Sequence, residues 1–336
     1  MLDYKKYLTN PIRSDRKPLY EMLPLKHPLR VLIDPSDICN FRCEFCFQSK
    51  RDFKGTKMTR ETFDKVVEQL REFEEPINVI HMYGLGEPLI NEQLPYFVER
   101  VKEEKVAKEV AITSNGSLLT EDLSQSLINA GLDRLSISLN GLKNDDFKKN
   151  AGVYVDFEKI YTNIKYFYRI RKKCHLHIKI NGEEFSEEQK GKFVELFKNY
   201  ADSINIDHIV NVWPGMEVVE ASTNRMYDYD LAGLKNKGEL PGVCPLMFYE
   251  LLVHADGTVS PCAVDYEFRS QNLGNVYGST LKQIWESDQL AEIRVQQLQG
   301  THNSYHVCNG CQYVDCAATV NITPYRYDLL SKYQNT

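Results

Sequence analysis

Three cysteines within eight residues form the part of this sequence best suited to chemistry. Cys39, Cys43 and Cys46 follow the spacing C-x3-C-x2-C, and the aromatic Phe45 precedes the third cysteine. A 4Fe–4S cluster takes a thiolate at each of its four irons. Three thiolates on one loop leave the fourth iron open to a small chelating molecule, to which it can pass an electron. A structural zinc site and a disulfide are the alternatives for these cysteines.

Two glycine-containing turns follow in the chain. The segment Tyr83-Gly84-Leu85-Gly86-Glu87-Pro88 comes after an apolar run, and Thr113-Ser114-Asn115-Gly116 comes after the next one. Glycine lets the backbone approach a ligand closely. Ser138 and Asn140 end a further apolar run. Turn formation and helix capping are the ordinary roles of such residues.

Together these motifs resemble the radical S-adenosylmethionine (SAM) superfamily. Its turn is usually written GGEP; here Leu85 replaces the first glycine, and Gly84 stands one place earlier. The resemblance implies that SAM binds the open iron and that its reductive cleavage gives a 5′-deoxyadenosyl radical, which abstracts hydrogen from a substrate. It also implies cofactor contacts from Phe45, Gly84, Gly86, Glu87, Pro88, Ser114, Asn115, Ser138, Asn140 and Lys179. Glu87 is expected to brace the turn.

From Leu29 onward the sequence alternates short apolar runs with amphipathic stretches, the pattern of βα units. We predict strands at 30–34, 78–84, 109–113, 134–139, 175–180 and 204–210, and helices at 59–73, 92–104, 120–130, 156–172 and 187–200. Six units fall short of the eight of a closed barrel. The α/β fold class that the resemblance implies is a partial (β/α)6 TIM-like barrel, followed by a small C-terminal Fe–S domain.

The predicted strand at 175–180 has two different faces. Leu176, Ile178 and Ile180 share one side, whereas His175, His177 and Lys179 share the other. Such alternation means one wet face, which we interpret as the lining of a central cavity; an edge strand facing bulk water is the alternative. His177, Lys179 and Asp207 are the candidates for a base in that cavity.

A second group of cysteines lies near the C-terminus. Cys244 and Cys262 are spaced C-x17-C, and Cys308 and Cys311 form C-x2-C. The pair Asp256-Gly257 predicts a hairpin that brings the first two together. The region resembles SPASM and twitch extensions, which implies one auxiliary 4Fe–4S cluster held by these four cysteines. A structural zinc held by the same four is the rival. Cys316 is one residue early for a full SPASM set; its candidate roles are an alternative ligand, an ordinary buried thiol and a hydrogen-atom donor.

The predicted organisation has five parts. They are an N-terminal arm at 1–28, the core barrel at 29–212, a linker at 213–242, the auxiliary-cluster domain at 243–320 and a tail at 321–336. We expect one helix across 280–297, and we interpret Cys174 as a small core residue.

The resemblance implies oxidation or epimerisation of a hydroxyl-bearing carbon of a sugar or cyclitol. In twitch-containing cyclitol dehydrogenases the auxiliary cluster accepts the substrate's electron, and in an epimerase Cys316 would return hydrogen. A flavodoxin or ferredoxin is the implied electron donor. Modification of a ribosomally made peptide is the alternative, although 28 residues before the first strand are too few for a recognition domain of ~50 residues. A non-catalytic Fe–S or zinc protein is the alternative from another class.

Composition excludes several other classes. A net charge of −6 argues against a nucleic-acid partner. There is no apolar run of about 18 residues, so no membrane span is expected. The N-terminus does not look like a secretory signal. Nine cysteines in such a chain indicate a reducing, cytoplasmic setting and metal ligation.

Overall fold

The computed structural model describes residues 3–9, 17–50, 55–182, 185–207, 242–264, 272–301, 305, 307–309, 311, 313 and 320–334. Six parallel strands lie side by side in the order β6-β5-β4-β3-β2-β1. They are β1 (Arg30–Ile33), β2 (Ile77–Met82), β3 (Ala107–Ser114), β4 (Arg134–Leu139), β5 (His175–Asn181) and β6 (Ser203–Asp207). This order confirms the predicted partial barrel.

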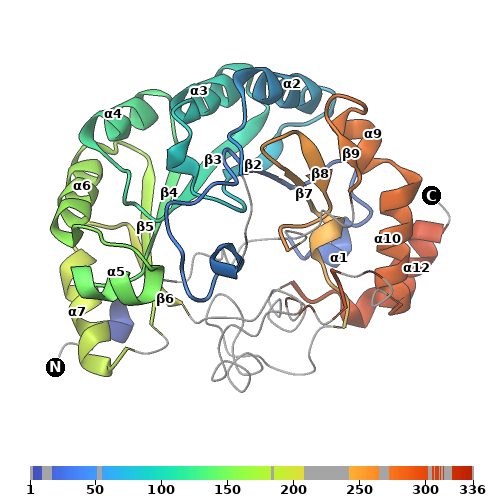
Figure 1. Cartoon of the computed structure of the whole chain (residues 1–336). Helices are drawn as coiled ribbons and strands as arrows, with labels where there is room; N and C mark the ends of the chain where they lie inside the picture. Colours follow the sequence, from blue (N-terminus) through green and yellow to red (C-terminus); the bar gives the residue numbers. More distant parts are fainter. Residues whose placement is uncertain are drawn as a thin grey trace.

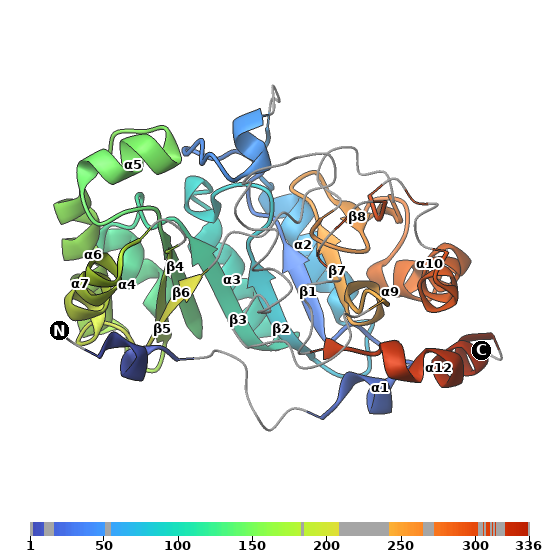
Figure 2. The ribbon, with the colours of Figure 1, turned by 90° about the horizontal axis from the view of Figure 1, so that it is seen from below.

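Helices form an arc around the outside of the curved sheet (Figure 1). They are α2 (Arg60–Leu70), α3 (Leu94–Glu104), α4 (Glu121–Asn129), α6 (Phe157–Ile170) and α7 (Glu187–Phe197), whereas α5 (Asn144–Ala151) lies apart from this arc (Figure 2). The predicted start of α2 is confirmed, since the Thr59 side chain accepts a hydrogen bond from the Thr62 backbone N–H. Gly131 follows α4 with a φ of 89°, which suits glycine. The short helix α5 has no counterpart among the predicted elements.

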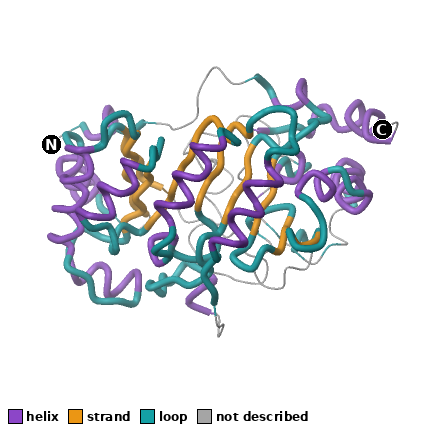
Figure 3. Tube along the Cα trace, turned by 90° about the horizontal axis from the view of Figure 1, so that it is seen from above, coloured by secondary structure: helices purple, strands orange, loops and turns teal. Residues whose placement is uncertain are grey.

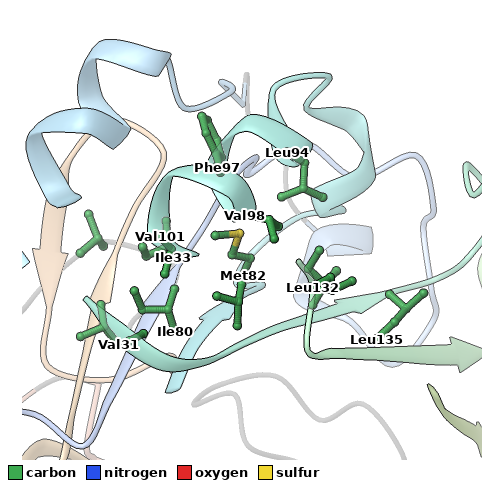
Figure 4. Close-up of a cluster of buried hydrophobic side chains, with 14 of the residues drawn as sticks. Val31, Ile33, Ile80, Met82, Leu94, Phe97, Val98, Val101, Leu132 and Leu135 are labelled. Carbon is green, nitrogen blue, oxygen red and sulfur yellow. The ribbon is translucent and has the colours of Figure 1, made fainter. Parts of the chain in front are cut away.

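The main core lies between the helices and the outer face of the sheet. In Figure 4, Ile33 and Met82 from two strands lie against Val101 and Val98 of α3. All four side chains are fully buried. Each contributes roughly 1.5–3 kcal/mol through the apolar surface it removes from water. Figure 3 shows the same layering from above, with helices over the strands.

The inner face of the sheet is polar. Leu176, Ile178 and Ile180 of β5 belong to the outer core. His177 and Lys179 therefore point to the opposite, inner side. Because β5 pairs with both β4 and β6, it is not an edge strand. The edge-strand alternative is therefore wrong for β5, and the lining of a central cavity by this face stays a prediction.

The C-terminal region continues the same sheet. Strand β7 (Glu250–Val253) pairs in parallel with β1, and β8 (Thr258–Ser260) and β9 (Gly274–Asn275) follow antiparallel. The result is one nine-stranded sheet. Figure 2 shows β7 beside β1. The predicted hairpin is confirmed, with Gly257 at a φ of 83° between β7 and β8. The auxiliary region is therefore built directly onto the first barrel strand.

Several expected elements differ from those found. The single helix predicted at 280–297 is wrong: α9 (Leu281–Trp285) and α10 (Asp288–Gln299) are separate, because the Ser287 side chain caps α10 at Leu290 N–H. The tail at 321–336 contains α12 (Arg326–Gln334), which packs on α10. The predicted linker at 213–242 lies, up to residue 241, outside the described residues.

The N-terminal arm is partly helical. It carries the short helices η1 (Tyr4–Tyr7) and α1 (Leu19–Met22), and Leu8 forms a parallel bridge to Ile204. Further 3-10 turns are η2 (Phe47–Lys50), η3 (Pro88–Ile90), η5 (Leu246–Phe248) and η8 (Thr323–Tyr325). Within the described ranges, no helix is both long and apolar enough to cross a membrane.

Candidate active site and cluster sites

The first cysteine group lies on the loop that leaves the C-terminal end of β1. The loop turns tightly, with the Cys46 backbone N–H donating to the Cys43 carbonyl at 3.0 Å. It is tied to α5, because Arg42 N–H donates to Ala151 O at 2.8 Å and Glu44 N–H donates to Asn150 O at 3.2 Å. The carboxyl ends of parallel strands are where barrel enzymes place their sites. All three cysteines are partly exposed there.

The three thiols are close enough to influence one another. Burial raises the pKa of Cys39 to about 11, and also raises the pKa values of Cys43 and Cys46. Repulsion from the neighbouring sulfurs adds to the rise for Cys39 and Cys43. Three mutually repelling thiolates require a positive group between them. This arrangement fits a cluster of irons.

The glycine–glutamate turn presses directly against the cluster loop. A Cβ at Gly86 would come within 2.2 Å of Ser36 O and 2.4 Å of Ile38 O, so only glycine fits. Gly84 faces the Asp34 side chain, whose carboxylate accepts a hydrogen bond from Leu85 N–H at 3.1 Å. The backbone of the turn is thus held at the same edge of the sheet as the cysteines.

Glu87 braces this turn, as expected. Its buried carboxylate accepts hydrogen bonds from Ser114 Oγ at 2.7 Å, Asn115 N–H at 2.8 Å and Leu89 N–H at 3.0 Å. Burial raises its pKa, against the lowering effect of these bonds. The Asn115 side chain also donates to Asn40 Oδ1 at 2.9 Å, on the cluster loop. Glu87 therefore joins the ends of β2 and β3 beside the cysteines.

Other predicted cofactor residues lie around the same edge. Asn140 donates from Nδ2 to Cys43 Sγ at 3.5 Å, so the structure ties it to a cysteine. Ser138 lies on the inner face of β4, Pro88 is buried at the start of η3, and Phe45 is partly exposed on the loop. The cofactor contacts of these residues remain predictions.

Sequence reasoning missed Gln48. This buried side chain donates from Nε2 to Asp37 O at 2.9 Å and to Leu85 O at 2.7 Å. It therefore holds the cluster loop against the glycine–glutamate turn. A glutamine two positions after Cys46 carries no sequence signal of that role.

The inner face of the barrel carries the three predicted polar residues. Lys179 Nζ lies 2.7 Å from Asp207 Oδ2, and both side chains are partly exposed. His177 is buried and shares a hydrogen bond of 2.7 Å between Nδ1 and Ser203 Oγ. Burial, with the nearby Lys179 charge, lowers the pKa of His177 to about 4. The Asp207 charge raises the pKa of Lys179 further, so at neutral pH the histidine is neutral and the lysine is charged.

The second cysteine group assembles from three segments of the chain. Cys244, Cys262, Cys308 and Cys311 line one cavity together with Leu246, Met247, Val264, Gln297, Val307 and Tyr313. Burial raises the pKa values of Cys244 and Cys262, and repulsion from the other sulfurs adds to the rise. Among the described residues, no three His, Cys, Asp or Glu side chains converge on a position for one metal ion. Four cysteines around one cavity could hold a cluster or a zinc ion.

Two cysteines stand apart from these sites. Cys174 is buried in the main core, which confirms its interpretation as a small core residue. Cys316 lies outside the described residues, so its role stays a prediction.

Comparison with known families identifies the class. The family described as "Radical SAM superfamily" matches residues 33–194, and SPASM, described as "Iron-sulfur cluster-binding domain", matches residues 244–312. Residues 33–194 therefore form a radical SAM domain, and residues 244–312 a SPASM-type iron–sulfur region. The chain is an enzyme of the radical SAM class with a C-terminal SPASM-type region.

Curated relatives are named GTP 3′,8-cyclases. The probable GTP 3′,8-cyclase of Sulfolobus acidocaldarius is 32% identical over 218 residues, covering 60% of this chain and 65% of the relative. The GTP 3′,8-cyclase of Aquifex aeolicus is 28% identical over 211 residues, covering 59% and 63%. A probable one of Methanococcus maripaludis is 36% identical over 121 residues, covering 36% and 38%. The chain thus matches less than two thirds of the length of each.

Solved radical SAM structures share the fold. BtrN in complex with AdoMet and 2-DOIA has a TM-score of 0.54 at 18% identity, covering 84% of this chain and 92% of BtrN. SuiB of Streptococcus suis bound to precursor peptide SuiA has a TM-score of 0.62 at 18% identity, covering 86% of this chain and 74% of SuiB. Native anSMEcpe with bound AdoMet has a TM-score of 0.59 at 19% identity, covering 92% of this chain and 97% of anSMEcpe. At these identities the likeness concerns architecture alone.

The cofactors of this radical SAM enzyme follow from its two matched regions. They are SAM with a 4Fe–4S cluster for the first region, and further Fe–S binding for the SPASM region. The residues present fit these groups: Cys39, Cys43 and Cys46 would hold the first cluster. Cys244, Cys262, Cys308 and Cys311 would hold the auxiliary one. The first set offers three thiolates and the second four, so only the first leaves an iron open.

Proposed function

We propose that this radical SAM enzyme oxidises a hydroxyl-bearing carbon of an uncharged polar small molecule, such as a sugar or cyclitol. When bound, SAM and the two clusters would supply hydrogen-atom abstraction and an electron acceptor. A flavodoxin- or ferredoxin-type protein is the proposed electron donor. The residues of the barrel interior must then bind the polyol and remove the hydroxyl proton.

The charge pairing of the barrel interior is the observation that carries this proposal. Arg134 Nη2 lies 2.9 Å from Glu109 Oε1, and Lys179 Nζ lies 2.7 Å from Asp207 Oδ2. Arg30 donates from Nε to Glu250 Oε2 at 2.8 Å. These three pairs lie on inner-face positions of β1 and β3 to β7, since the residues next to them in sequence belong to the outer core. Lys179 and Asp207 lie toward the carboxyl ends of their strands, on the side of the cysteine loop, whereas Arg30, Arg134 and Glu250 begin theirs.

Paired charges suit an uncharged ligand. Binding a triphosphate needs cations whose charge is not already balanced. On the described inner face, each of Arg30, Arg134 and Lys179 already has a carboxylate. Hydroxyl groups, in contrast, can donate to the carboxylates and accept from the cations without disturbing the balance.

The proton of the hydroxyl group needs an acceptor. Lys179 is unsuitable, because Asp207 holds it in its charged form. His177 is neutral near pH 7, but burial makes it a weak base, whereas Asp207 can accept a proton through its carboxylate. We assign Lys179 to orient the substrate oxygen, and Asp207 to accept its proton.

A second candidate is a GTP rearrangement, favoured by the sequence relatives named GTP 3′,8-cyclases. The test is a side-by-side assay of the anaerobically reconstituted, reduced enzyme with SAM. Carbon-deuterated polyols and GTP are supplied separately, and 5′-deoxyadenosine and products are analysed by mass spectrometry.

With a deuterated polyol, the proposal predicts deuterium in 5′-deoxyadenosine and a ketone product that a hydrazine reagent traps. With GTP it predicts no product. Turnover of GTP alone would replace the proposal with the second candidate. A polyol of inverted configuration that carries hydrogen in place of the abstracted deuterium would instead show epimerisation, the other reaction that the sequence resemblance implies.

A further inference from the structure

One helix frames the auxiliary cysteine cavity. Gln297 of α10 is fully buried and lines this cavity. Its Oε1 accepts a hydrogen bond from the Cys244 backbone N–H at 3.3 Å, and its Nε2 donates to Cys308 Sγ at 3.5 Å. One amide therefore connects two cysteines that come from distant parts of the chain.

The orientation of this amide is fixed by its partners. A backbone N–H can only donate, so the oxygen of Gln297 must face Cys244. The amide NH₂ is then directed toward the Cys308 sulfur. Gln297 thus offers a hydrogen-bond donor to a sulfur that would ligate iron, in a site where burial strengthens the interaction.

A buried positive charge lies one turn earlier on the same helix. Arg294 is 7% exposed, and its guanidinium stacks over the Trp285 ring at 4.1 Å. Its Nε donates to the carbonyl of Met247, a cavity-lining residue, at 3.0 Å. Its Nη1 donates to the Trp285 carbonyl at 3.3 Å, and among the described residues its Nη2 has no hydrogen-bond partner and no carboxylate pairs with it. A buried cation without an acid is unusual unless a negative group lies nearby.

Hydrogen bonds to cluster sulfurs and local charge are the means by which proteins set Fe–S reduction potentials. Reduction adds one negative charge to the cluster, and both an N–H donor and a nearby cation stabilise that charge. We propose that Gln297, supported by Arg294, is a positioning residue that orients Cys244 and Cys308 and raises the reduction potential of the auxiliary cluster. This inference rests on the proposed role of that cluster as electron acceptor.

The test isolates the auxiliary cluster in the full-length chain. Replacing Cys39, Cys43 and Cys46 with Ala removes the first ligand set, and the midpoint potential of the remaining cluster is measured by EPR during redox titration. In this background, Gln297→Met should lower the one-electron equilibrium constant for reduction at least about tenfold, which corresponds to about 59 mV. Arg294→Met should give a smaller shift in the same direction.

Gln296→Met is the matched control. Gln296 is the preceding residue on α10, and its side-chain amide donates to Glu292 at 3.0 Å rather than to a cysteine. Its replacement should leave the potential unchanged. An unchanged potential in Gln297→Met with the iron content intact would overturn the inference.

A second variant applies if Gln297→Met fails to retain iron. Gln297→Glu keeps an oxygen for the Cys244 N–H but places a carboxyl group against Cys308. The potential should then vary with pH, because reduction makes the carboxyl take up a proton; a potential that matches the parent at every pH would contradict the inference. Both measurements omit substrate, so their outcome is independent of whether the enzyme oxidises a polyol.

Discussion

The two cysteine groups would both ligate iron, but they differ in the number of their thiolates and in the segments that supply them. Cys39, Cys43 and Cys46 come from one loop and are all partly exposed. The auxiliary group comes from three segments, and of its four cysteines Cys262 is buried while Cys244, Cys308 and Cys311 are partly exposed, as in the first group. Three thiolates at the mouth of a barrel make an open site, whereas four around an inner cavity make a closed one. The difference separates binding a reactive cofactor from storing an electron.

Removing one cysteine from each group should separate these roles most strongly. Cys43→Ala should reduce 5′-deoxyadenosine formation more than about 100-fold, because the open cluster loses a ligand. Cys244→Ala should retain that formation while abolishing substrate oxidation, since only the electron acceptor is lost. Chromatographic analysis of 5′-deoxyadenosine and product in the same reactions checks both.

Cys174→Ala is the control for these variants, because Cys174 lies in the main core away from both groups. It should keep both activities. Equal loss of 5′-deoxyadenosine in Cys43→Ala and Cys244→Ala would remove the distinction between the groups.

The brace beneath the open site should also matter for stability. Glu87→Ala leaves Ser114 Oγ and the N–H groups of Leu89 and Asn115 without their acceptor. We expect a loss of about 3 kcal/mol in the free energy of unfolding, measured by urea denaturation, together with weaker SAM binding. Glu92→Ala removes an exposed carboxylate five residues later and should have little effect on either. Similar behaviour of the two variants would argue against the brace.

Lys179, on the inner face of the barrel, should affect the binding of substrate more than the binding of SAM. Lys179→Met removes a charged hydrogen-bond donor from the inner face and leaves Asp207 without its partner. KM for the polyol should rise about tenfold or more, with SAM affinity unchanged. Lys198→Met, which removes a surface lysine paired with Glu195, is the matched control. A selective loss of SAM affinity would instead make Lys179 a cofactor ligand, as the sequence resemblance implies.

The smallest predicted effect is a pH dependence from His177. Its pKa of about 4 in the folded chain lies below its ordinary value of 6.5, because burial disfavours the charged ring. Above pH 6.5 His177 is neutral in both the folded and the unfolded chain, so it has no effect on the free energy of unfolding. As the pH falls from 6.5 toward 4, the unfolded chain binds a proton that the folded chain does not, and the free energy of unfolding decreases. Between pH 7.5 and 5.5 the loss from this residue is about 1 kcal/mol.

His177→Phe should remove that part of the pH dependence, measured as the shift of the urea midpoint between the two pH values. An equal shift in the parent protein and the variant would show that His177 is not held neutral by the fold.

Features that depend on neighbouring residues in the chain could be predicted from the sequence, whereas those that depend on distant residues could not. The cysteines at 39, 43 and 46 and the strand–turn pattern are local, so their site and the six barrel strands were predictable. The pairing of β7 with β1 was not, because it joins residues 220 positions apart, as Arg30 and Glu250 show. Ser287 ended a predicted helix early, since a serine cap competes with helix continuation. The roles of Gln48 and Gln297 depend on partners that only the fold brings near.

The most direct test of the account compares the two sites by EPR after reduction. One variant keeps only Cys39, Cys43 and Cys46, and the other keeps only the four auxiliary cysteines, with the remaining set changed to Ala. We predict that adding SAM shifts the g-values of the first variant and leaves those of the second unchanged. A SAM-dependent change in the auxiliary variant, or none in the first, would contradict the assignment of one open and one closed cluster.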